Sequence, residues 1–375
     1  MKALTSPLFF IGIFVALCIL TISNYKQIFN TGDETSEAIP PKPHTVEFLS
    51  QPYRIDKQYK SMEGPFSTQI VSLSDSDTAE LLWITGYHTM VVAEDGVTPV
   101  SQEFLCHNNL DFRPGDRAGV FNSTAILSSR IFTLSQGVFS IEMPAGFGIP
   151  VMSNQTFNLT TQVLNHNIEN PNINVRHRVV INYVRDQDIK GKITPLFPAN
   201  AFVAALLDAQ EGDNGYYGIR NANSIQQGAT CLPGTHAGNS DKANVFKDLL
   251  GKKFSGHWVV KLGREERRTL VTKIMNIPYD TRVHYIAVHV HPFSESLELR
   301  DLTTGQTVFK STMTGPKDRI GLTQVDSLVS QQGIPVFEDH EYELVSVYNN
   351  TSGVEQDAMA TMIIYLQDKT FESPD

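Results

Sequence analysis

Short runs of β-branched and aromatic residues, separated by glycine, proline, asparagine and aspartate, recur along most of this chain and leave few folds open to it. Examples are LLWITGYHTMVV at residues 81–92 and VHYIAVHVH at residues 283–291. Runs of this length predict β-strands, and close spacing with little helical periodicity is typical of β-sandwiches and barrels. We therefore predict an all-β protein.

The strand-like runs fall into two series of similar size, and a chain of 375 residues is long enough for two domains. We predict one β-sandwich over residues 64–195 and a second over residues 256–370. Between them, residues 196–255 read as a linker, because a Gly/Asn/Gln-rich stretch occupies much of it. The run ANAFVAALLDAQ at residues 199–210 predicts a short helix in this linker.

An apolar run without charges spans residues 7–22, and Lys2 is the one basic residue before it. Its length lies between that of a signal peptide core and a full membrane span, and Tyr25-Lys26 replaces the small residues of a cleavage site. Residues 1–25 therefore predict a signal anchor or signal peptide, with a polar linker over residues 26–63. The body is expected outside the cytosol, either anchored to a membrane or secreted.

The formal net charge of -10 makes nucleic acid an unfavourable partner, because a phosphate backbone would be repelled over most of the surface. Only Cys106 and Cys231 lie outside the apolar run, and whether they form a disulfide stays open. Five Asn-x-Ser/Thr sequons would suit a glycoprotein exported by a eukaryote, and they occur at Asn122, Asn154, Asn158, Asn349 and Asn350.

The strongest local signal for chemistry is His289-Val290-His291 within a predicted strand. Residues two apart on a strand point to the same face, so both imidazoles can reach one metal ion. Copper, zinc, iron and nickel all accept imidazole ligands. The alternative is two polar residues on a solvated face. His284 has the opposite parity and is expected on the other face.

Other candidate ligands stand in similar surroundings. His88, His107 and His166 lie in or near predicted strands of the first half, where a hydrogen-bonded structural histidine is the alternative. Met359 and Met362 lie in the last predicted strand, where filling the core is the usual role of methionine. A thioether ligand favours Cu(I), so a His-His-Met set would select copper.

Four segments of this chain resemble the copper type II, ascorbate-dependent monooxygenases, the family of peptidylglycine α-hydroxylating and dopamine β-monooxygenases. Residues 285–311 are similar to that family's second-domain H-x-H strand and the strands after it, and residues 357–365 to its terminal segment with the methionine ligand. Residues 86–92 and 157–167 resemble first-domain segments that carry copper ligands. The segments occur in the family's order.

This resemblance implies two tandem jelly-roll-like β-sandwiches, each with one copper ion, facing each other across a cleft. His289, His291 and Met359 would hold the oxygen-binding, catalytic copper. His88 and His166 would belong to an electron-storing first site. Thr89 stands where the family has a second adjacent histidine, so we infer that His107 supplies the missing ligand.

Two classes of function follow. The first is a copper monooxygenase that hydroxylates a C–H bond of a small-molecule substrate with O2 and ascorbate or another reductant. The second is a non-enzymatic exported β-sandwich protein that binds copper or transfers electrons. A hydrolase has no support, since neither G-x-S-x-G nor H-E-x-x-H occurs.

Overall fold

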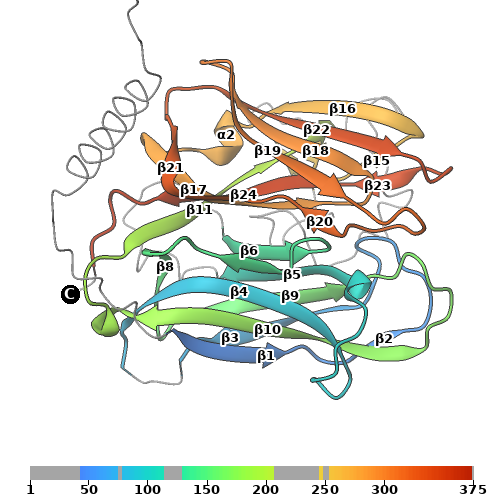
Figure 1. Ribbon diagram of the computed structural model, residues 1–375, viewed down its shortest axis with the longest axis horizontal. Helices are drawn as coiled ribbons and strands as arrows, with labels where there is room; N and C mark the ends of the chain where they lie inside the picture. The colour runs from blue at the N-terminus through green and yellow to red at the C-terminus, as the bar shows by residue number, and fades with distance from the viewer. Residues whose placement is uncertain (1–42, 75–77, 114–128, 207–244, 248–252, 374–375) are drawn as a thin grey trace, which may run out of the picture. The chain divides into compact units, whose positions relative to one another are not determined.

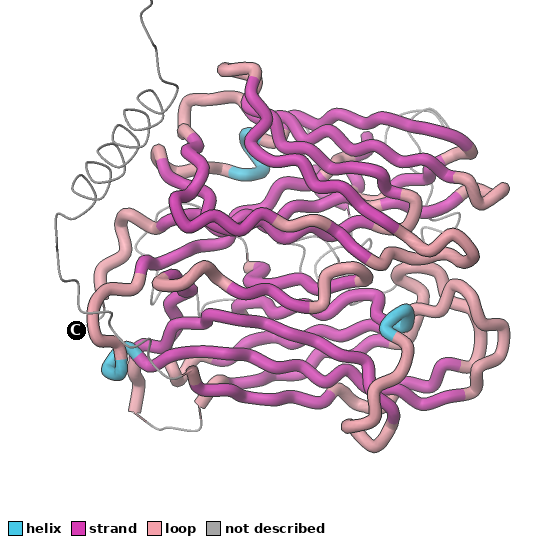
Figure 2. The backbone as a smooth tube through the Cα atoms, viewed as in Figure 1, coloured by secondary structure: helices cyan, strands magenta, loops and turns pink. Residues whose placement is uncertain are grey.

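Strands make up nearly all of the regular structure, as Figure 2 shows in magenta. The computed structural model describes residues 43–74, 78–113, 129–206, 245–247 and 253–373. Helical turns in this part are short, namely α2 (Thr272–Met275) and the 3-10 turns η1 (Gln102–Phe104) and η3 (Asp186–Asp188). The predicted all-β class is therefore confirmed.

The first sandwich is built from two sheets. One sheet contains, in spatial order, β1 (His44–Leu49), β10 (Ile173–Arg185), β4 (Leu81–Ala93) and β8 (Phe147–Met152), with β2 (Tyr53–Ile55) on β10 and β7 (Ser140–Glu142) on β4. The other contains β3 (Phe66–Ser72), β9 (Thr156–Val163), β5 (Leu105–Phe112) and β6 (Arg130–Ser135).

The second sandwich repeats this arrangement. One sheet contains β11 (Thr194–Phe202), β24 (Ala360–Gln367), β17 (Thr281–Val290) and β21 (Leu328–Val336). The other contains β16 (Gly263–Leu270), β22 (Tyr342–Asn350), β18 (Ser294–Asp301), β19 (Gln306–Thr314) and β20 (Gln324–Val325). Figure 1 shows the two sandwiches as blue-to-green and yellow-to-red strands, with green β11 in the second.

Both sandwiches have jelly-roll topology. Numbered along the chain, the eight main strands of each follow the order 1-8-3-6 in one sheet and 2-7-4-5 in the other, which is the jelly-roll order. A two-residue parallel pairing of β8 with β11 joins one sheet of each sandwich. Shorter pairs complete the description: β15 (Trp258–Val260) with β23 (Gln356–Ala358), and β14 (Lys253–Ser255) with β12 (Ala205–Leu206) and β13 (Val245–Lys247).

The two sandwiches meet along a seam between the outer face of the β3-β9-β5-β6 sheet and strands β17 and β24. Tyr365 of β24 donates a hydrogen bond to the carbonyl oxygen of Ile131 in β6 at 2.9 Å, and its ring lies 5.8 Å from that of Phe132. Tyr285 pairs with Tyr365, so the face of β17 that carries Tyr285 and His289 faces the first sandwich.

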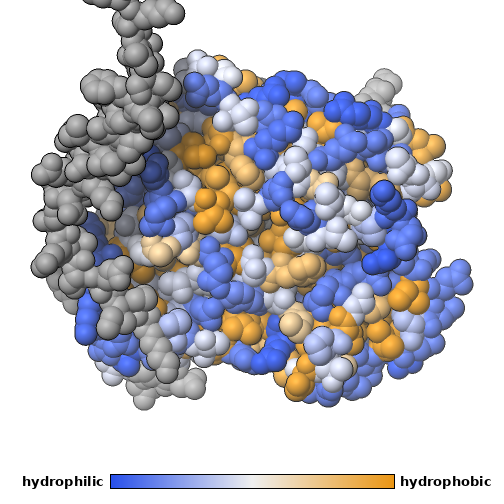
Figure 3. All heavy atoms as spheres, viewed as in Figure 1, coloured by the Kyte–Doolittle hydropathy of each residue, from blue (hydrophilic) through white to orange (hydrophobic). Residues whose placement is uncertain are grey.

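Strand β17 is buried on both faces, which explains its almost continuously apolar sequence. At the far side of the second sandwich the edge strand β16 alternates exposed and half-buried residues and is rich in Arg and Glu. The surface around β16 is largely hydrophilic in Figure 3. Charges on an exposed edge discourage pairing with another chain.

Two of the predicted boundaries are wrong. Residues 44–55, assigned to the first linker, form β1 and β2 of the first sandwich. These strands are polar because β1 exposes alternate residues at the sheet edge. Residues 194–206, assigned in large part to the second linker, contain the first strand of the second sandwich, so that sandwich begins before residue 256.

The predicted helix at residues 199–210 is also wrong where it can be compared. Residues 199–202 belong to β11, which pairs with β24 over residues 196–202, and residues 207–210 lie outside the described residues. Burial on both faces gives this strand an Ala-rich, apolar sequence that reads like a helix, and tertiary pairing overrides that propensity.

The N-terminal predictions fall outside the described part of the chain. Residues 1–40 form a separate unit, and residues 41–375 form the unit with both sandwiches. The apolar run at residues 7–22, Asn122 and Cys231 lie among the residues that are not described. In the described residues, no helix has the length and apolar character needed to cross a membrane.

Candidate metal centre

The histidine pair at the end of β17 lies on one face of the strand, as its parity predicts. The rings of His289 and His291 are perpendicular with centroids 5.7 Å apart, and each residue is only 3% exposed. The solvated-face alternative is therefore wrong for this pair. His284 lies apart from them. Its ring is tilted by 33° against that of Phe147, with centroids 4.1 Å apart, and its Nδ1 forms a hydrogen bond with the Ser330 carbonyl oxygen.

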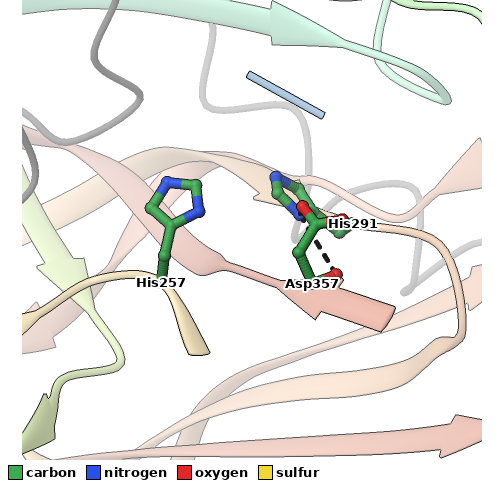
Figure 4. Close-up of side chains that lie close together, drawn as sticks. All are labelled: His257, His291 and Asp357. Atoms are coloured by element: carbon green, nitrogen blue, oxygen red, sulfur yellow. Dashed lines mark hydrogen bonds and ion pairs between the residues drawn. The ribbon is translucent and has the colours of Figure 1, made fainter. Parts of the chain in front are cut away.

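Two residues that the sequence analysis did not single out join His291. Asp357 of β23 forms an ion pair with His291 Nδ1 at 2.9 Å, and His257 immediately precedes β15, the strand that pairs with β23. Ligand atoms of His257, His291 and Asp357 all lie within 4.8 Å of one another. Figure 4 shows the three side chains close together, with a dashed line between His291 and Asp357.

Pairing between strands distant in sequence creates this group. Val259 lies opposite Asp357 in the β15-β23 pair, which brings His257 beside β23. The His291 amide donates to the Met359 carbonyl oxygen at 3.3 Å and continues the β17-β24 pairing by one residue. His257 and Asp357 are therefore neighbours of His291 only after both pairings have formed.

The charge state of the group suits a cation. Burial alone would raise the pKa of Asp357, but the charge of His291 and its hydrogen bond outweigh burial and lower that pKa, so the carboxylate is ionised at neutral pH. Burial lowers the pKa of His257 to about 3, so this imidazole is neutral. A neutral imidazole and an ionised carboxylate are the forms that bind metals.

Several buried ring nitrogens near this group have no hydrogen-bond partner within the described ranges. They are Nε2 of His257 and both ring nitrogens of His289. Buried polar atoms are nearly always paired, so each exception needs an explanation. A metal ion would account for one nitrogen of each ring, because a neutral imidazole has a single ring lone pair to donate.

The first sandwich contributes two more histidines to the seam. Asn108 bonds to Tyr87 in the opposite sheet of its own sandwich, so the neighbouring His107 points outward, where it is fully buried under the second sandwich. Burial lowers the pKa of His107, and the charges of Arg130, His177, His291 and His257 lower it further. Burial also lowers the pKa of His166, and the charge of Asp357 acts against this shift by raising the pKa.

His88 does not take part. Its Nε2 lies 2.7 Å from Glu142 Oε1 and 3.0 Å from Asn182 Nδ2, and its side chain is 29% exposed. The adjacent Tyr87 points into the core, so His88 lies on the outer face of the other sheet. The structure thus separates His88 from His107 and His166, which lie near His291 instead.

Met359 lies beside His291 through its backbone, and its side chain is fully buried. That side chain packs against Met62 and Phe202. The Met359 carbonyl oxygen also accepts a hydrogen bond from the Tyr348 hydroxyl at 2.6 Å. Met362 packs in the main core, as expected of an ordinary core methionine.

The sequence held a weak signal for one of the missed residues. His257 lies in GHWVVKL, a predicted strand, but no second ligand stands nearby to make it noticeable. Asp357 comes just before Met359 and Met362, and the residues around it have the composition of a turn. Only the strand pairing distinguishes these residues from other histidines and aspartates.

Comparison with known proteins does not identify the chain. No family model matches it, and no curated protein matches it. Among solved structures it is similar to the STIV MCP crystal structure, with 8% identity, 87% of this chain and 97% of that chain covered, and a TM-score of 0.32. PBCV-1 VP54, fitted into a reconstruction of the virophage Sputnik, gives 8% identity, coverage of 89% and 95%, and a TM-score of 0.30. Likeness at this level carries no argument about function.

Proposed function

We propose that this protein binds one transition-metal ion in the seam, with His257, His291 and Asp357 as ligands. The observation that carries the proposal is the convergence of three ligand atoms within 4.8 Å in a buried setting, beside imidazole nitrogens that have no hydrogen-bond partner among the described residues. Two imidazoles and one carboxylate suit zinc, iron(II) or copper.

Of the two functions predicted from the sequence, the arrangement favours the non-enzymatic metal-binding or electron-transfer protein. A monooxygenase of the resembled kind needs two separate copper sites. Here His88 lies on an outer sheet face with Glu142, whereas His107 and His166 lie toward His291 in the same seam. A single centre therefore accounts for more of the buried histidines than two centres do.

The residues around the ligands have identifiable roles. Asp357 supplies the negative charge that offsets a cation in a buried site, where an uncompensated charge is costly. The Tyr348 hydroxyl holds the backbone at both His291 and Met359 and so fixes the spacing of two strands. The expectation of an exported body rests on the apolar N-terminal run alone. The choice between the two functions does not affect it, so we retain it.

Metal stoichiometry of the full-length chain tests the proposal. The protein is stripped with a chelator, titrated with Zn(II) and with Cu(II), and analysed for bound metal. We expect one equivalent, with His257→Ala, His291→Ala and Asp357→Ala each weakening binding by more than the roughly 10–100-fold that loss of an outer partner costs. His177→Phe is the matched control, because His177 is equally buried but lies outside the ligand group.

Three outcomes would be informative. Retention of full affinity in all three alanine variants refutes the site. Two equivalents of copper with oxygen consumption that depends on a reductant would restore the monooxygenase hypothesis. Equal loss of metal from the His177→Phe control would show that the alanine variants act through the fold.

A further inference from the structure

A cavity of about 240 Å³ lies between the two sandwiches, and none of the candidate metal ligands lines it. The first sandwich lines it with η1 and with the connection from β6 to β7. The second sandwich lines it with residues 316 and 319–323 of the loop between β19 and β20. This volume corresponds to about eight water molecules at roughly 30 Å³ each, so the cavity suits a small molecule of similar size.

The loop that forms one wall of the cavity is held in a fixed shape. Its two ends approach closely, since a Cβ atom at Gly315 would lie 2.5 Å from the Gly321 carbonyl oxygen. The Asn167 side chain of the first sandwich bonds both backbone groups of Ile320, at 2.9 and 3.0 Å. Because these contacts hold the loop in place, a ligand would lose little free energy to ordering the site.

Two oppositely charged side chains, one from each sandwich, line the cavity. Arg319 Nε lies 3.4 Å from Glu103 Oε2, and the side chains are 50% and 22% exposed. Arg319 Nη1 lies 3.4 Å from the Asp318 carboxylate. Both distances exceed the roughly 2.7–2.9 Å of a short charge-assisted hydrogen bond, and neither contact pairs two nitrogens with two oxygens. The guanidinium therefore keeps donors for a ligand carboxylate.

The chemistry of the lining defines the class of ligand. Among the described residues that line the cavity, Glu103 and Arg319 are the charged ones, and their charges cancel. A ligand that carries both a carboxylate and an ammonium group can pair with each of them and brings no net charge. Phe139, Pro316 and Leu322 add apolar surface that suits an apolar side chain.

We propose that this cavity binds a free α-amino acid with an apolar side chain. Arg319 pairs with the carboxylate of the ligand, and Glu103 pairs with its ammonium group. The bound amino acid bridges the two sandwiches, because its partners come from both. This site is separate from the metal centre, so neither proposal depends on the other.

Calorimetric titration of the full-length protein with L-valine, L-leucine and L-phenylalanine tests the proposal. We expect one equivalent of at least one of them to bind. The N-acetyl and amide derivatives of that amino acid should not bind, because each lacks one of the two charges. Arg319→Gln and Glu103→Gln should each weaken binding at least about tenfold, as expected for the loss of one charge-assisted hydrogen bond. Arg264→Gln is the matched control, since Arg264 forms an exposed ion pair with Glu295 at 3.2 Å but does not line the cavity.

Proteolysis gives a second test that needs no variant. Trypsin cleaves after Lys317 and Arg319 in the loop, and a saturating amino acid should slow this cleavage because it holds the loop against the first sandwich. The inference is overturned if none of the three amino acids binds, or if both Gln variants bind as wild type does. Binding of either derivative at the affinity of the amino acid, or cleavage at the rate of the unliganded protein, would also overturn it.

Discussion

His177 should make the unfolding free energy sensitive to acid. This residue is completely buried in β10, and both of its ring nitrogens lack partners in the part of the chain that is described. Burial lowers its pKa to about 3 from an ordinary value of 6.5. The unfolded chain therefore binds the proton more readily than the folded chain. Stability contributed by neutral His177 is complete above pH 6.5 and is lost progressively as the pH falls toward 3.

The size of the effect follows from the two pKa values. At about pH 5 the linkage relation gives a loss of about 2 kcal/mol relative to about pH 7.5, and full protonation would cost up to about 5 kcal/mol. Urea unfolding of chelator-treated, full-length protein at both pH values measures it. In His177→Phe the drop between the two pH values should be about 2 kcal/mol smaller than in wild type.

Comparing the drop in unfolding free energy between the two pH values, instead of the free energies themselves, avoids the effect of packing. The His177 ring lies edge-on to Tyr53 with centroids 6.0 Å apart, and a larger ring there changes stability at every pH. His177→Gln serves as the control, because it cannot titrate either and should show the same reduced drop. If wild type and both variants lose equal free energy between the two pH values, the reasoning is wrong.

Two further predictions concern hydrogen bonds that fix the site and the seam. Tyr348→Phe should lower the unfolding free energy by about 1–3 kcal/mol, since its buried hydroxyl accepts from the His291 amide and donates to the Met359 carbonyl oxygen. An unchanged urea midpoint would contradict this. Asn167→Ala should speed tryptic cleavage of the loop that carries Ile320, because the Asn167 side chain bonds both backbone groups of that residue across the two sandwiches. Cleavage at the wild-type rate would show that these bonds do not hold the loop.

The strands were predictable where alternate residues or β-branched runs mark them, as at residues 81–92 and 283–291. Prediction failed where the environment of a strand departs from the usual two-faced pattern. Strand β1 is an exposed edge and reads as linker, and β11 is buried on both faces and reads as helix. Neither error could be corrected without the pairing partner, which lies more than a hundred residues away for each.

The candidate centre was predictable only in part. The shared face of His289 and His291 follows from the geometry of a single strand and needs no knowledge of its pairing partners. The partners of His291 depend on pairings between β15, β23, β17 and β24, and no local pattern encodes them. The structure does not bring His88, His107 and His166 together, as the first-site prediction expected. The position of His88 along its strand places it on an outer sheet face, whereas that of His107 places it in the seam.

The seam explains why this part of the chain misleads sequence reasoning. The outer face of β5, β6 and β9 carries His107, Asn109, Thr133 and Gln162, a composition typical of a sheet face in contact with water. All four are nearly or completely buried under the second sandwich. Burying such groups is costly unless each finds a partner, and a bound ion would satisfy several imidazoles at once. The composition of this face thus predicts exposure to solvent, whereas the fold buries it. Such disagreement between local sequence and fold is expected at functional sites.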